Sequence, residues 1–288
     1  MNQRYRYCGF VLDSDLPLPE LDTVTAGTAN SDIRIRRFRA GKVPSNLNAY
    51  GPNWALGPDE GWWWLEDRVV FRVQPGAIDV DAKDTEGALV RALLLEAPMI
   101  MAMIFQEAFC LNAASVKLGD ETIVFCGAAG SGRSTAAARL ALKGGHLITD
   151  SLARIDASEG SSPQIIPQGS GCLLWPHALT LLGLPADHGR PVRLGTKLRR
   201  LFLDASPAPQ PVDRLYWRHA NAAHHIDEQV SKDLPTTRQR FSRIACITAG
   251  HLWIDPAGRS TAHFQWCLQL ARSCHLAPAP NSHFQWTI

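Results

Sequence analysis

The sequence predicts an α/β fold in which a small, mostly antiparallel β domain (residues 1–84) precedes a larger α/β domain (residues 85–288). Three observations lead to this prediction. Turn residues separate short strand-like segments up to about residue 81, apolar helical segments begin soon afterwards, and a strand runs directly into a glycine-rich loop and a helix at residues 122–143. The length of 288 residues agrees with about two domains.

The first domain contains short strand candidates. Residues 33–36 read Ile-Arg-Ile-Arg, and this alternation has the period of a half-buried strand. Turn sequences such as 57–61 and 74–76 separate the others. These further strand candidates lie at residues 5–12, 54–56, 62–65, 69–73 and 78–80. The spacing of the last four, from 54–56 to 78–80, predicts an antiparallel meander.

The second domain begins with two apolar helices, expected at residues 88–95 and 99–109. The second helix is hydrophobic on nearly every side, which indicates a buried core element. Strand candidates follow at residues 113–117 and 122–126, with a turn between them.

Composition argues against several classes of protein. Of the residues, 45% are hydrophobic and 19% are charged, which is unlike a disordered chain. The 29 lysines and arginines nearly balance the 27 aspartates and glutamates, so the formal net charge is only +2. Such a chain gives no electrostatic reason to expect nucleic acid or an anionic membrane as a partner.

The cysteines and the apolar segments predict a cytoplasmic protein. The seven cysteines are an odd number without a C-x-x-C pair, which is typical of reduced, buried thiols. The first ten residues lack the apolar core of a signal peptide. Arg91 and Glu96 interrupt the most apolar stretch, so its uncharged core at 97–105 is far shorter than the roughly 20 residues that cross a bilayer. We therefore expect no membrane partner.

A glycine-rich segment at the end of the second strand carries the chemistry. Residues 127–134 read Gly-Ala-Ala-Gly-Ser-Gly-Arg-Ser, and an alanine-rich helix follows at 135–143. This is the context of the phosphate-binding loop (P-loop, or Walker A motif) G-x-x-x-x-G-K-[ST], with arginine in place of lysine. The glycines let backbone N–H groups surround a phosphate at a helix N-terminus. Arg133 would meet the terminal phosphates, and the Ser134 hydroxyl would ligate Mg²⁺.

The pattern therefore predicts ATP and Mg²⁺ as cofactors. A strand candidate at 146–150 ends in Asp150, which an α/β sheet would place beside the loop. There Asp150 would either join Ser134 as a Mg²⁺ ligand or accept a proton from an attacking hydroxyl. The predicted nucleotide-binding residues in the loop and the helix start are Gly127, Ala128, Ala129, Gly130, Ser131, Gly132, Arg133, Ser134 and Thr135.

Residues 127–155 resemble the P-loop region of HPr kinase/phosphorylase and the HPr kinase-related proteins, where a G-x-S-G-x-G-K-S loop and helix lead to a strand ending in Asp-Asp. Weaker similarity extends to residues 14–21, 111–116 and 174–176. The resemblance implies the nucleotide-binding core shared with phosphoenolpyruvate carboxykinase and transfer of a phosphoryl group to a serine. Some related kinases accompany lasso-peptide maturation enzymes and phosphorylate a peptide serine. Related kinases also form oligomers, so the resemblance makes a homo-oligomer an option.

Within this resemblance, Asp150 matches the aspartate that is the family's catalytic base. Three positions depart from the pattern. Arg133 replaces the loop lysine, Ser151 replaces the second aspartate, and Asn112 replaces a histidine expected near the base. Asparagine can form hydrogen bonds there, but it cannot titrate. Lys197 lies in a basic stretch that resembles one in the related kinases, and it is the candidate for a second phosphate contact.

The leading hypothesis is an ATP- and Mg²⁺-dependent kinase whose acceptor is a serine of a peptide or small protein, such as a lasso-peptide precursor. The three departures support a different class of protein, a catalytically weakened or inactive adaptor that binds a nucleotide or a peptide or protein partner. In such an adaptor the aromatic run at residues 62–64 would help to hold the partner. A free amino-acid or sugar kinase stays open. So does the choice among ATP, GTP and pyrophosphate.

Overall fold

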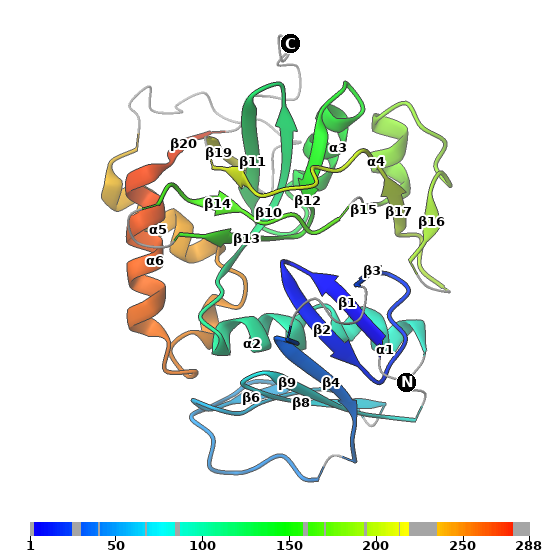
Figure 1. Cartoon of the computed structure of the whole chain (residues 1–288), viewed down its shortest axis with the longest axis vertical. Helices are drawn as coiled ribbons and strands as arrows, with labels where there is room; N and C mark the ends of the chain where they lie inside the picture. The colour runs from blue at the N-terminus through cyan, green and yellow to red at the C-terminus, as the bar shows by residue number, and fades with distance from the viewer. Residues whose placement is uncertain are drawn as a thin grey trace. The chain divides into compact units, whose positions relative to one another are not determined.

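The computed structural model describes residues 3–24, 30–39, 41–66, 68–83, 87–157, 161–169, 171–192, 195–212, 214–218 and 235–278 (Figure 1). The chain forms two compact units. Unit 1 comprises Met1–Phe109 and Gly250–His263, and unit 2 comprises Cys110–Ala249 and Phe264–Ile288. Both units combine strands with helices, so the predicted α/β class is confirmed.

Unit 1 is built on a sheet whose nine described strands follow the order β3-β1-β2-β4-β9-β8-β7-β6-β5. Neighbouring strands run antiparallel, except that β4 is parallel to both β2 and β9. The first domain is therefore mostly antiparallel, as predicted. The strands are β1 (Gln3–Tyr7), β2 (Phe10–Ser14), β3 (Asp22–Thr23), β4 (Ile33–Arg37), β5 (Ala49–Tyr50), β6 (Trp54–Leu56), β7 (Gly61–Leu65), β8 (Val69–Gln74) and β9 (Ala77–Ala82).

Side-chain alternation explains these strands. In β4 the two isoleucines, Ile33 and Ile35, are fully buried. Arg36, whose side chain is on the other face of the strand, is paired with Asp79 of β9. The Asp79 carboxylate is itself buried and also accepts from Arg72 at 2.6 Å. A buried carboxylate with two guanidinium partners keeps the hydrogen bonds that it would otherwise form with water.

Helices α1 (Ala88–Leu94) and α2 (Ala97–Phe105) belong to unit 1. Together they form a stretch apolar and long enough to cross a membrane by length and composition, and half of it is buried inside the structure. Helix α2 packs against β7, β8 and β9, and seven of its nine residues are buried. This burial is what the sequence predicts for a core helix.

The unit boundary therefore differs from the predicted domain boundary. The sequence places the change at residue 84, where the strand pattern ends, whereas the compact unit continues to Phe109. The physical reason is that the β sheet needs an apolar layer to cover one face, and α2 supplies it. The segment 250–263, which includes the 3₁₀ helix η1 (His251–Trp253), also returns to unit 1, where the indole of Trp253 lies edge-on to that of Trp54.

Unit 2 is built on a sheet in which seven described strands follow the order β18-β14-β13-β10-β11-β19-β20, while β12 pairs with β10. Strand β19 is parallel to both β11 and β20. The strands are β10 (Cys110–Leu118), β11 (Glu121–Gly127), β12 (His146–Thr149), β13 (Leu152–Asp156), β14 (Gln164–Ile165), β18 (Gln210–Pro211), β19 (Arg214–Arg218) and β20 (His275–Pro278). A separate three-stranded sheet has the order β15 (Gly171–Leu174), β17 (Arg199–Phe202) and β16 (Arg190–Pro191).

Helix α3 (Arg133–Ala141) packs on β10, β11, β12 and β15. Its inward face consists of Ala137, Ala138 and Leu140, all buried in the core of the unit. Small side chains on this face let the helix backbone lie close to the sheet, which fixes the position of the preceding loop. The other helices are α4 (Pro176–Leu181), α5 (Thr237–Ile247) and α6 (Ser260–Ser273).

Candidate functional site

The glycine-rich loop joins β11 directly to α3. Gly127, Gly130 and Gly132 have φ angles of 148°, 79° and 80°, a region that favours glycine. At Gly127 a Cβ atom would lie 2.3 Å from the carbonyl oxygen of Arg218. The loop closes on itself, because the Ser131 N–H donates to the carbonyl oxygen of Ala128 at 3.2 Å. The predicted strand, loop and helix are therefore present at these residues.

The N-terminus of α3 faces this loop. Its first residues, Arg133, Ser134 and Thr135, have N–H groups that find no acceptor within their own helix. The helix dipole places partial positive charge at the same end. Ala128, Ala129 and Gly130 are exposed at the loop tip, so an anion from solvent can reach the loop.

The structure brings Ser134 and Asp150 into contact. Asp150 follows β12 and is 5% exposed, and the Ser134 hydroxyl is hydrogen-bonded to its carboxylate. The Leu173 N–H donates to Asp150 Oδ2 at 2.8 Å. Burial raises the pKa of Asp150, opposed by the hydrogen bonds from Leu173, Ser134 and Ser151 and by the charge of Arg133. The carboxyl thus has a raised affinity for a proton or another cation.

A sharp turn holds this aspartate. The Leu152 N–H donates to the carbonyl oxygen of Asp150 at 2.8 Å, which closes a three-residue turn around Ser151. Ser151 has a φ of 69°, which is uncommon for a residue with a Cβ atom. The Ala113 N–H of β10 donates to the Ser151 carbonyl oxygen at 3.2 Å and secures the turn.

The described contacts join neither Asn112 nor Lys197, two of the predicted residues, to this group. The strand register pairs Asn112 of β10 with Leu152 of β13, two positions beyond Asp150. Lys197 is exposed on the connection between β16 and β17, and among the described contacts none joins it to the loop. Their predicted roles stay predictions.

The sequence motif does not include two further residues that lie at the loop. Arg218, the last residue of β19, donates from Nε to the Ser131 carbonyl oxygen at 2.8 Å. The buried Cys172 of β15 donates from Sγ to the Ser134 carbonyl oxygen at 3.5 Å, and burial together with the nearby Asp150 raises the pKa of its thiol. The sequence gives one signal for Arg218, which is its position as the basic end of the strand-like segment Arg214–Arg218. No local pattern pointed to Cys172.

Other candidate sites are weaker. The sequence also groups side chains of metal-ligand type at His224, His225, Asp227 and Glu228, and these lie outside the described residues. Within the described residues, no group of three or more His, Cys, Asp or Glu side chains is arranged to hold a metal ion. In the aromatic run, Trp62 is buried and the Trp63 ring packs near Phe71, with 5.9 Å between ring centroids. These two side chains are therefore part of the packing of unit 1.

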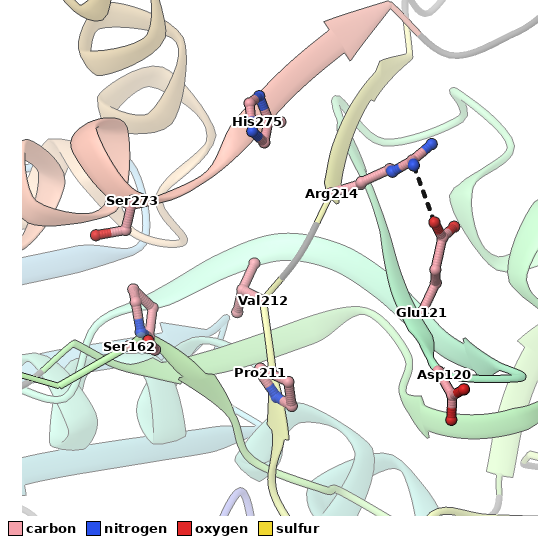
Figure 2. Close-up of a pocket in the computed structure, with 9 residues that line it drawn as sticks. Asp120, Glu121, Ser162, Pro211, Val212, Arg214, Ser273 and His275 are labelled. Carbon is pink, nitrogen blue, oxygen red and sulfur yellow. Dashed lines mark ion pairs between the residues drawn. The ribbon is translucent and has the colours of Figure 1, made fainter.

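A pocket of about 460 Å³ lies at the opposite end of β11 and β19 from the loop (Figure 2). Its charged side chains include Arg214 and Glu121, which form an ion pair at 2.9 Å, with 51% of each exposed. Such a surface pair contributes little energy, and with Asp120 also in the lining the pocket has no excess positive charge for a phosphate. The candidate site is therefore the loop, where a helix N-terminus, a hydroxyl and a buried carboxyl converge.

Comparison with models of known protein families and with curated proteins finds no match to this chain. The function proposed below therefore depends on the site itself and on the motif resemblance described above.

Proposed function

We propose that the chain is an ATP- and Mg²⁺-dependent kinase with a P-loop core of the HPr kinase type, which transfers the γ-phosphoryl group to a serine of a peptide or small protein. The observation that carries the proposal is the hydrogen bond between Ser134, at the start of α3, and Asp150, at the end of β12. P-loop enzymes use such a hydroxyl and carboxylate together at the metal.

The residues at the loop suit a phosphate group. The exposed Gly130 leaves the loop backbone accessible, and α3 directs its N-terminal N–H groups to the same place. Arg133 adds a guanidinium whose Nη1 is buried and has no hydrogen-bond partner in the described part of the chain. A polyphosphate would supply acceptors for these donors.

Ser134 and Asp150 suit Mg²⁺, because a hydroxyl and a carboxylate are oxygen ligands, which this cation prefers. When bound, Mg²⁺ would neutralise charge on the phosphates. It normally keeps several waters and takes further ligands from the phosphates, so two protein oxygens are enough for such a site.

Asp150 also suits the proton transfer. In the proposed reaction the acceptor oxygen bonds to the γ-phosphorus, the bond from that phosphorus to the leaving oxygen of ADP breaks, and the hydroxyl proton passes to Asp150. A carboxyl whose pKa is raised by burial holds such a proton more readily than an exposed one.

Radiolabel transfer tests this proposal. The protein is incubated with γ-labelled ATP, Mg²⁺ and a degenerate peptide library with one fixed serine, and free phosphate is followed in parallel. We expect labelled phosphoserine with the wild type and a loss of at least about 100-fold in Asp150→Asn, the scale of a general base. Equal transfer by Asp150→Asn would contradict the role of Asp150.

One observation favours the adaptor hypothesis as a second candidate. Asp150 is only 5% exposed, so an acceptor reaches it only if neighbouring groups move. The double variant Asn112→His, Arg133→Lys discriminates between the two. A large gain in transfer indicates a decayed kinase, whereas a loss indicates that the native residues suit a retained reaction.

The seven cysteines are free, and all except Cys246 are buried. We extend the proposal to a cytoplasmic location, because reduced thiols persist in a reducing compartment. Peptide or small-protein acceptors are the partners that follow from the proposed reaction.

A further inference from the structure

Arg218 contacts the loop from a neighbouring strand. The parallel register of β19 and β11 places it beside Gly127. Its Nε donates to the Ser131 carbonyl oxygen at 2.8 Å, and its Nη2 would lie 3.2 Å from a Cβ atom at Gly132. The guanidinium therefore lies directly against the residues that precede α3.

Positive charge at the loop exceeds the negative charge near it. Arg133 and Arg218 are both half-buried, and burial lowers the pKa of each guanidinium. Asp150 attracts Arg133, whereas the charge that acts on Arg218 is the like charge of Arg139. In the described part of the chain no carboxylate forms an ion pair with Arg218. Two partly buried guanidinium groups with only the Asp150 carboxyl near them leave an excess of positive charge, which favours binding of an anion.

A buried hydroxyl provides an independent sign of a ligand. Ser131 is 4% exposed, and its Oγ is 3.0 Å from the position of a Cβ atom at Gly127, inside the loop. This Oγ has no hydrogen-bond partner among the described residues. Buried polar groups are nearly always paired, so the loop is built to receive a polar partner.

We propose that Arg218 is the second cation of the phosphate site and that the site selects a nucleoside triphosphate over a diphosphate. This inference rests on the proposed function, in that it takes the loop to bind phosphates. One guanidinium comes from the loop and the other from β19, so together they match a chain of phosphates better than a single one. Coulomb attraction to two cations rises with the charge of the ligand, and this favours the triphosphate.

Calorimetric binding to Mg²⁺–ATP, Mg²⁺–ADP and inorganic triphosphate tests the inference. The variants are Arg218→Gln, Arg218→Lys and, as a matched control, Arg214→Gln at the exposed start of the same strand. For Arg218→Gln we expect the affinity for ATP and triphosphate to fall roughly 10- to 100-fold, as for a lost charged hydrogen bond, and the affinity for ADP to fall less. Arg218→Lys should recover most of the loss, and Arg214→Gln should change each affinity less than twofold.

The outcomes separate this inference from the kinase proposal. If Arg218→Gln weakens ATP and ADP equally, or lowers only the melting temperature, Arg218 merely supports the loop and the inference is wrong. If the wild type binds inorganic triphosphate in an Arg218-dependent way but no nucleotide, Arg218 is the second cation of a phosphate site, whereas the selection of a nucleoside triphosphate and the kinase proposal both fail. Binding of none of the three probes to the wild type overturns both.

Discussion

The buried carboxyl of Asp150 is the residue on which the chemistry depends. It accepts from Leu173, Ser134 and Ser151 and feels the charge of Arg133, yet burial is the largest influence and raises its pKa. Its proposed work, to hold a proton or a cation, is therefore opposed to the stability of the empty protein at neutral pH.

This opposition predicts a pH-dependent effect of Asp150→Asn. A folded-state pKa above the unfolded value means that the folded protein binds the proton more tightly, so the free energy of unfolding falls as pH rises above about 4 and levels off above the folded pKa. Asparagine cannot ionise, so the variant should be more stable than the wild type at pH 7 to 8. The gap should close as pH falls towards 4, as measured by urea unfolding at each pH.

Asp79→Asn is the control with the opposite sign. Asp79 is buried like Asp150, but Arg36 and Arg72 pair with it. Loss of its charge should lower the free energy of unfolding by about 3 kcal/mol at pH 7. If Asp150→Asn is destabilising in the same way, burial does not dominate at Asp150.

The sequence predicted some residues of the site and missed others for a physical reason. Arg133 and Ser134 follow from the local spacing of the loop, and Asp150 follows from the helix and strand after it. Arg218 lies 87 residues beyond Ser131 and reaches it only because β19 is the parallel neighbour of β11. Strand neighbours of this kind depend on tertiary packing, which a motif does not encode.

At the scale of elements, β11, the loop and α3 form the part most fully specified by local sequence. Glycines allow the positive φ angles, and alanines let α3 lie close to the sheet. The alternating strands of unit 1 were likewise predictable from their period of two. By contrast, apolar residues 88–105 indicate a buried helix without indicating the sheet that it covers.

Two glycines of the loop should respond differently to alanine. A Cβ atom at Gly127 would meet the Arg218 carbonyl oxygen at 2.3 Å, whereas at Gly130 it would meet nothing within 4 Å. Gly130→Ala should cost only the positive-φ penalty, about 1–2 kcal/mol. Gly127→Ala adds a backbone clash and should cost roughly 3 kcal/mol or more. Urea unfolding measures both, and equal losses would contradict the close approach of β19 to the loop.

At the scale of the whole molecule, the chain crosses between its two units more than once. Residues 250–263 return to unit 1 after the chain has built most of unit 2. A linear reading of composition divides the chain at one point, so it could not predict this return. The candidate loop, its aspartate and both arginines all belong to unit 2.

The most direct test of a nucleotide site is a thermal-shift titration of the full chain with ATP and Mg²⁺, beside the Ser134→Ala variant. Ligand at 100 times its dissociation constant adds roughly 2.7 kcal/mol, which should raise the melting temperature by several degrees. The account predicts a Mg²⁺-dependent rise in the wild type that Ser134→Ala abolishes. No rise with ATP, GTP or ADP, or an equal rise in the variant, would contradict it.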